Sequence, residues 1–172
     1  QGNGDLVKSL LLQFCEQAYP SLVAYIADNV AFPNSMVDRI TPAASDEELS
    51  YIHNLNIADN VPVTAESFRQ WVVEDRYCND RPPWEEVGIT VVEDVEPYEK
   101  IKVRLLNGGH VAIGFAGHLA GVDCVHEVAG APVFQSFLHK FFTETSVTLH
   151  PVPGVDISQY QDMLIKRFSN SN

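Results

Sequence analysis

The chain has 172 residues, of which 45% are hydrophobic and 20% are charged, so it can bury a sizeable core and is not a disordered polymer. Its formal net charge of -12 at pH 7 argues against nucleic acid or an anionic membrane as the main partner, because both require a basic surface. No apolar run is long enough to span a bilayer. These properties select no substrate, since one basic pocket can lie in an acidic protein.

The first third of the chain predicts helices and a short extended segment. Apolar residues recur at helical spacing from residue 6 and Pro20 interrupts the pattern, so we expect two helices between residues 6 and 32. Residues 35–42 predict a short strand or an extended turn. Ser45 and Glu48 have the spacing of a capping box, which predicts the start of another helix.

The rest of the chain predicts two strands and then three helices. The expected strands are 62–75 and 88–95, and the expected helices are 97–121, 132–146 and 158–168. The sequence therefore predicts a mainly α fold with a small β element. The composition shifts near residue 45, where we expect a domain boundary.

Three widely spaced cysteines, with no Cys-x-x-Cys pair, indicate reduced thiols in a cytosolic protein. A metal site built from Cys124, His126 and His118 is conceivable, but its spacing matches no standard set of ligands. We therefore expect no metal.

The predicted helix 97–121 carries polar side chains on one face. With Lys102 at zero and about 100° per residue, Glu99 lies at about 60° and His110 at about 80°. Asn107 lies at about 140° on the same scale. The other positions are apolar or small nearly all round, so we expect a buried helix.

These side chains suit proton transfer from an alcohol. Burial disfavours the charged form of a lysine, and a neutral Lys102 can act as a general base. Asn107 and a neutral His110 can hydrogen-bond the oxyanion that forms. The residues make half of an alcohol dehydrogenase, and the other half is a hydride acceptor.

An interpretation without catalysis is also open. Lys102 can extend to solvent, Asn107 can be a helix-end residue, and His110 can be a core histidine with its hydrogen bonds satisfied. Five glycines of the segment are expected at close-packing positions, against a neighbouring helix or a ligand: Gly108, Gly109, Gly114, Gly117 and Gly121. They follow no predicted strand, so they form no dinucleotide-binding fingerprint.

Four segments resemble, in family order, the long-chain polyol dehydrogenases, the family of mannitol dehydrogenase and fructuronate reductase. They are FPNSMVDRITP (32–42), FRQWVVED (68–75), RPPWEEVG (81–88) and KVRLLNGGHVAIGFAGHLAG (102–121). The resemblance runs from about Asn3 to the C-terminus. A lysine, an asparagine five residues on and a histidine three further form a specific motif.

The resemblance implies a metal-independent oxidoreductase that uses NAD or NADP and interconverts a sugar alcohol or an aldonate with the matching keto sugar. Carried over by motif position, Lys102 is the general base, and Asn107 and His110 hold the substrate oxygen. Glu99 matches a position linked to proton exchange between that lysine and water.

The resemblance also implies that Asp38, with Val37 beside it, contacts a substrate hydroxyl. Without the resemblance, a second interpretation is equally open: Asp38 forms an ion pair with Arg39 or caps a turn.

In the domain organisation that the resemblance implies, residues 1–45 are the last part of a Rossmann-like dinucleotide-binding domain. Residues 46–172 are the first part of a helical substrate domain, similar to the C-terminal domain of 6-phosphogluconate dehydrogenase. The family's phosphate loop and an asparagine that partners Asn107 would precede Gln1, and further substrate-binding residues would follow Asn172. We therefore expect an internal piece of an enzyme, for which no cofactor-binding residue can be named.

The leading functional prediction is oxidation of a secondary alcohol of a mannitol-like polyol to the ketose, and the reverse reduction. One alternative is a mannonate- or altronate-type sugar-acid oxidoreductase. Another, of a different class, is a non-catalytic helical interaction module derived from this family. The expected partner is a polyol or ketose, and the resemblance favours a monomer.

Overall fold

The computed structural model describes residues 2–42 and 44–171, which form two compact units. Residues 4–42 and 44–92 form the first, here called the sheet unit, and residues 2–3 and 93–171 form the second, the helical unit. The division differs from the boundary expected near residue 45, because the strands that follow that point pair with the strand that precedes it. The assignment of dinucleotide binding to the first domain and of substrate binding to the second stays a prediction.

The sheet unit contains helices and a three-stranded sheet. Its elements are α1 (Asn3–Ala18), η1 (Pro20–Leu22), α2 (Val23–Asn29), β1 (Ser35–Asp38), α3 (Asp46–Asn54), β2 (Gln70–Glu74), η2 (Trp84–Val87) and β3 (Thr90–Val92). The strand order is β1-β2-β3, with β1 antiparallel and β3 parallel to β2. Met36, Val72 and Val73 are buried and form its apolar centre.

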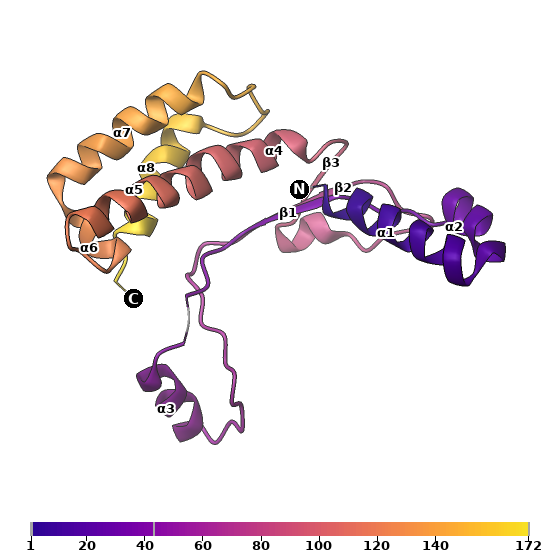
Figure 1. The fold of residues 1–172 in the computed structure, drawn as a ribbon, viewed down its shortest axis with the longest axis horizontal. Coiled ribbons are helices and arrows are strands. Elements are labelled where there is room, and N and C mark those ends of the chain that lie inside the picture. The colour runs from indigo at the N-terminus through magenta and orange to yellow at the C-terminus, as the bar shows by residue number, and fades with distance from the viewer. Residues whose placement is uncertain (1, 43, 172) are drawn as a thin grey trace. The chain divides into compact units, whose positions relative to one another are not determined.

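Local sequence signals explain these elements. Pro20 begins η1 and separates α1 from α2, which confirms the predicted break. Ser45 and Glu48 form both hydrogen bonds of the capping box at the start of α3, as predicted. Figure 1 shows α3 on an extended arm of the chain between β1 and β2. None of the residues of α3 is buried, so this helix depends on its cap and its local hydrogen bonds.

In the helical unit, shorter helices pack against one side of a long helix. The elements of this unit are α4 (Glu96–Ile101), η3 (Lys102–Asn107), α5 (Gly108–Leu119), α6 (Val125–Gly130), α7 (Pro132–Ser146) and α8 (Ile157–Phe168). The first three follow one another without a gap and form the α4–α5 helix. Helices α6 and α7 pack against it, and α8 packs against both of them (Figure 1). The centre of the unit holds side chains with no exposed surface, among them Leu105, Ile113, Leu138, Phe142 and Leu164.

The predicted fold class, mainly α with a small β element, is confirmed. The short helices η2 and α6 were not predicted, because four and six residues are too few to show a helical period. No helix among the described residues is long and apolar enough to cross a membrane.

Candidate active site

The middle of the α4–α5 helix is π-helical, and this segment, η3, begins at Lys102 and ends at Asn107. The Gly108 N–H donates to the Val103 carbonyl, five residues back. Residues five apart lie about 140° apart around an α-helix. A turn closed by i→i+5 bonds holds more residues, so it brings such positions closer to alignment. The α-helical spacing assumed for Lys102 and Asn107 is therefore wrong, and the π turn brings them nearer to one face.

The α4–α5 helix is buried on one side only, so the prediction of a buried helix holds for that side and is wrong for the other. Every fourth residue from Ile101 to Gly117 is buried: Ile101, Leu105, Gly109, Ile113 and Gly117. The other side exposes Phe115 (71%) and Leu119 (87%). Lys102 is half-buried, and Asn107 and His110 are exposed. Apolar residues on the exposed side hid this asymmetry from the sequence pattern.

Two glycines let neighbouring helices approach the buried side, as predicted. A Cβ at Gly109 would lie 2.8 Å from Phe142 Cε1 on α7 and 3.3 Å from Phe168 Cε2 on α8. A Cβ at Gly117 would lie 2.4 Å from Val128 Cγ2 on α6. Gly114 has nothing within 4 Å, so no neighbouring helix packs there, and close packing against a ligand stays a prediction at this position.

His110 has an aromatic neighbour that the sequence did not reveal. Its ring centroid lies 6.0 Å from that of Phe168, with the planes tilted by 58°. Phe168 is 3% exposed, and it is also one of the two phenylalanines that approach the helix closely at Gly109. Helix α8 therefore supports the His110 imidazole through Phe168, next to the buried residues of the α4–α5 helix. The apolar period predicted α8 but contained no signal that links it to His110.

Glu99 lies on α4 one turn before Lys102 and is 6% exposed. Its Oε1 accepts a hydrogen bond of 3.3 Å from the Gly2 N–H. Glu99 is thus a nearly buried carboxylate one helical turn from Lys102, a position that suits the predicted proton relay. The relay itself stays a prediction.

Val37 and Asp38, the other two predicted substrate residues, belong to β1 in the sheet unit. Successive side chains of a strand point to opposite faces. Asp38 is 1% exposed, on the same face as the buried Met36, whereas Val37 is 53% exposed on the other face. If one ligand meets both residues, Val37 takes part through its backbone.

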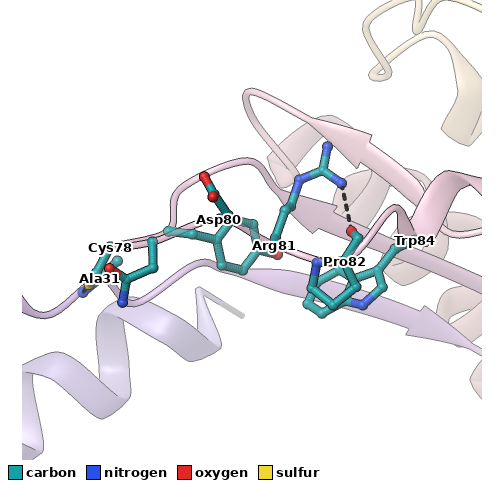
Figure 2. A pocket seen from close by; sticks show the side chains of 8 residues that line it. Ala31, Cys78, Asp80, Arg81, Pro82 and Trp84 are labelled. Carbon is teal, nitrogen blue, oxygen red and sulfur yellow. Dashed lines mark hydrogen bonds between the residues drawn. The ribbon is translucent and has the colours of Figure 1, made fainter.

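The sheet unit also has a shallow pocket of about 270 Å³ beside η2 (Figure 2). Arg81 lies in its wall and donates to Asp75 Oδ1 at 2.8 Å and to both carboxylate oxygens of Glu85 at 2.6 and 2.7 Å. Hydrogen bonds from Arg81 hold the pKa of Glu85 at about 2, and the two carboxylates raise the pKa of Arg81. The guanidinium is thus engaged within the protein, which makes it a poor anion receptor.

Burial raises the pKa of Tyr77, another residue that lines this pocket. Its ring meets that of Trp84 edge-on, with 5.5 Å between the centroids, and Trp84 stacks on Trp71 at 5.6 Å. The pocket is therefore the rim of an aromatic cluster. Residues 2–42 and 44–171 include no group of three or more His, Cys, Asp or Glu side chains able to hold a metal.

Comparison with known families gives two matches along the chain. The family model of the mannitol dehydrogenase Rossmann domain matches residues 1–86, and that of the mannitol dehydrogenase C-terminal domain matches residues 94–172. The chain belongs to the mannitol dehydrogenase family. The change from one family domain to the other lies close to the change from the sheet unit to the helical unit.

Relatives of the mannitol dehydrogenase family match along nearly the whole chain. Mannitol 2-dehydrogenase of Phaeosphaeria nodorum is 45% identical over 175 residues, which cover 99% of this chain and 31% of that protein. The ternary complex of Pseudomonas fluorescens mannitol 2-dehydrogenase with NAD and D-mannitol is 41% identical with a TM-score of 0.85, over 98% of this chain and 35% of that one.

A substrate-free D-sorbitol dehydrogenase is 36% identical with a TM-score of 0.89, over 98% of this chain and 35% of that one. The chain therefore spans about a third of the length of these relatives.

Proposed function

We propose that the protein oxidises a secondary alcohol of a sugar alcohol to the ketose and catalyses the reverse reduction, with NAD as the hydride acceptor. The observation that carries the proposal is the π-helical segment of the α4–α5 helix. It has Lys102 at one end and Asn107 at the other, and His110 follows one turn later on the exposed side. Two relatives named for polyol substrates support the substrate class.

In the proposed reaction the amine of Lys102, in its neutral form, takes the proton of the substrate hydroxyl. The side-chain amide of Asn107 and one N–H of a neutral His110 donate hydrogen bonds to the alkoxide as its charge develops. Glu99 then exchanges the proton between Lys102 and water. Asp38 contacts a further hydroxyl of the polyol and contributes to binding rather than to the proton transfer.

The connection between β3 and α4 does not fit the cofactor's diphosphate. A dinucleotide fold holds it on a glycine-rich loop between a strand and a helix. Here β3 is joined to α4 by residues 93–95, which are Glu-Asp-Val and contain no glycine. Two carboxylates at that turn would repel a diphosphate. This connection is therefore not proposed as part of the NAD site.

Replacing the lysine tests the proposal most directly. Lys102→Ala in the natural full-length protein should lower kcat for mannitol oxidation by about 10²- to 10⁴-fold, because it removes the general base. Small primary amines in the buffer should restore part of the rate. The measurement is initial-rate kinetics at saturating NAD and polyol.

Lys100→Ala is the matched control. Lys100 lies two residues away on the same helix and pairs with Glu96 at 2.9 Å on the surface, so its loss should leave kcat nearly unchanged. Near-normal turnover of Lys102→Ala would refute the role of Lys102 as base. Absence of dehydrogenase activity from the wild-type protein across polyols and sugar acids would favour the non-catalytic module.

A further inference from the structure

Asn34, the asparagine of the FPNSMVDR segment, lies at the centre of a polar cluster at the start of β1. It is 6% exposed, and each of its polar atoms is hydrogen-bonded. Its Oδ1 accepts from the Asp5 N–H at 3.1 Å, and its Nδ2 donates to Asp5 Oδ2 at 2.9 Å and to Glu74 Oε1 at 3.3 Å. Its N–H donates to Glu74 Oε2 at 2.9 Å, and its carbonyl accepts from the Glu74 N–H at 3.0 Å. One side chain thus ties the first turn of α1 to the end of β2.

Two carboxylates near Asn34, those of Asp5 and Glu74, share one guanidinium, that of Arg76. Glu74 is 6% exposed, and its Oε2 lies 3.0 Å from Arg76 Nη2. The same nitrogen lies 3.5 Å from Asp5 Oδ1 and donates to the Phe32 carbonyl at 3.2 Å. The hydrogen bond from Asn34 is the main reason that the pKa of Asp5 is lowered. Buried groups in such a network are costly to leave without a partner, so the network favours a single arrangement.

Gly4 allows α1 to reach this cluster. A Cβ at Gly4 would lie 2.5 Å from the Phe32 carbonyl oxygen and 2.6 Å from that of Pro33, and both are backbone atoms that cannot move aside. The first turn of α1 therefore rests directly on the chain that leads into Asn34. This contact brings the Asp5 N–H, which has no partner within the helix, to the Asn34 side chain.

The cluster lies where the register of β1 on β2 is decided. The pairs run from Ser35 opposite Val73 to Asp38 opposite Gln70, and the Asn34–Glu74 hydrogen bonds extend them by one position. A slip of one residue would turn every side chain of β1 to the other face. The apolar pattern of the strands specifies this register poorly. Strand β1 has only four residues, and the last three residues of β2 are all buried, so burial does not alternate between the two faces of β2.

We propose that Asn34, clamped by Glu74, fixes the register of β1 on β2 and is thereby the positioning residue that holds Asp38 on the buried face. The inference rests on the proposed function, which assigns Asp38 to a substrate hydroxyl. Asn34 touches no reacting atom, so its loss should act on polyol binding through Asp38 and leave the proton transfer at Lys102 intact.

The test is a double-mutant cycle of Asn34→Ala and Asp38→Ala in the natural full-length protein. Asn34→Ala should raise KM for mannitol about tenfold, the equivalent of one lost hydrogen bond to a charged group. It should leave kcat and KM for NAD within about twofold, because only ground-state binding is lost. In the Asp38→Ala background it should change KM for mannitol by less than about twofold, since coupled residues are not additive. Asn29→Ala, an exposed asparagine of α2 in the same unit, is the control and should change nothing.

The outcomes separate the two proposals. An equal rise in KM in both backgrounds, or no rise in either, overturns the positioning role while Asp38 keeps its own. No change in KM on Asp38→Ala alone overturns the substrate contact of Asp38 and the positioning role with it. No effect of Lys102→Ala on kcat would instead refute the proposed function at its base.

A register measurement covers the case in which Asn34→Ala is too unstable for kinetics. Val37 and Trp71 are opposite each other, at a position where the ladder alternation predicts the closer spacing of a non-hydrogen-bonded pair. Val37→Cys with Trp71→Cys should form a disulfide on oxidation, detected by peptide mass spectrometry, in much lower yield once Asn34→Ala is added. An unchanged yield overturns the proposal.

Discussion

In the helical unit, apolar contacts hold the α4–α5 helix. Phe142 and Phe168 pack closely against Gly109, and the ring of Phe168 lies beside that of His110. In the sheet unit, the start of β1 rests on polar contacts, with Asn34 bonded to α1 and to β2. Apolar packing is non-directional, so it sets how close two helices come. Hydrogen bonds are directional, so they can specify a register to a single residue. The two units thus hold their candidate site residues in place by different physical means.

Changes that keep side-chain shape should separate the two regions most clearly. Leu138→Met, at a fully buried position on α7, should cost less than about 1.5 kcal/mol of unfolding free energy, because it conserves volume. Asn34→Asp has nearly the same shape but removes both donors and adds a carboxylate beside Asp5 and Glu74. It should cost about 3–5 kcal/mol, as expected for an uncompensated buried charge. Urea unfolding of the full-length protein measures both.

The loss from Asn34→Asp should shrink as the pH falls, because protonation of the new carboxyl removes the repulsion and restores one donor. Equal costs for Leu138→Met and Asn34→Asp at pH 7 would contradict the distinction between directional and non-directional contacts.

Two glycines of α5 sharpen the comparison within the helical unit. Gly109→Ala should destabilise the protein by about 1–3 kcal/mol, because the new methyl group would overlap Phe142 and crowd Phe168. Gly114→Ala has nothing within 4 Å and should be neutral or stabilise the helix by up to about 1 kcal/mol. Thermal unfolding of both variants tests this pair, and a Gly109→Ala protein as stable as Gly114→Ala would show that α7 and α8 can move aside.

The smallest effect is expected at the exposed ion pair of Arg81 and Glu85. The pKa of Glu85 is about 2, below its ordinary value of 4.5, so the stability that the pair contributes is present above pH 4.5. It declines as the pH falls from 4.5 towards 2 and is absent below that. Glu85→Gln should therefore be slightly less stable than wild type at pH 7, and the difference should shrink as the pH falls from 4.5 to 2. A difference that does not shrink over this range would mean that shape, rather than charge, holds the pair.

Local signals in the sequence were enough to predict most elements. Pro20 breaks the first helix because it lacks an N–H, and the box of Ser45 and Glu48 begins α3 because it satisfies two helix N–H groups. The run from Pro132 to Ser146 is helical over its predicted length. The motif of Lys102, Asn107 and His110 was also visible, because it depends on residue type and spacing alone.

Tertiary structure decided what those signals could not. The apolar pattern of α5 looks the same around the helix, and only the packing of α6, α7 and α8 shows which side is buried. No local sequence signal predicts the π turn at Lys102, since an i→i+5 turn has no residue signature. Likewise, the partners of Asn34 lie 29 and 40 residues away, and hydrogen bonds across such separations exist only after the chain has folded. Spacing along the chain therefore determined which residues are candidates, while long-range packing determined which of them share a surface.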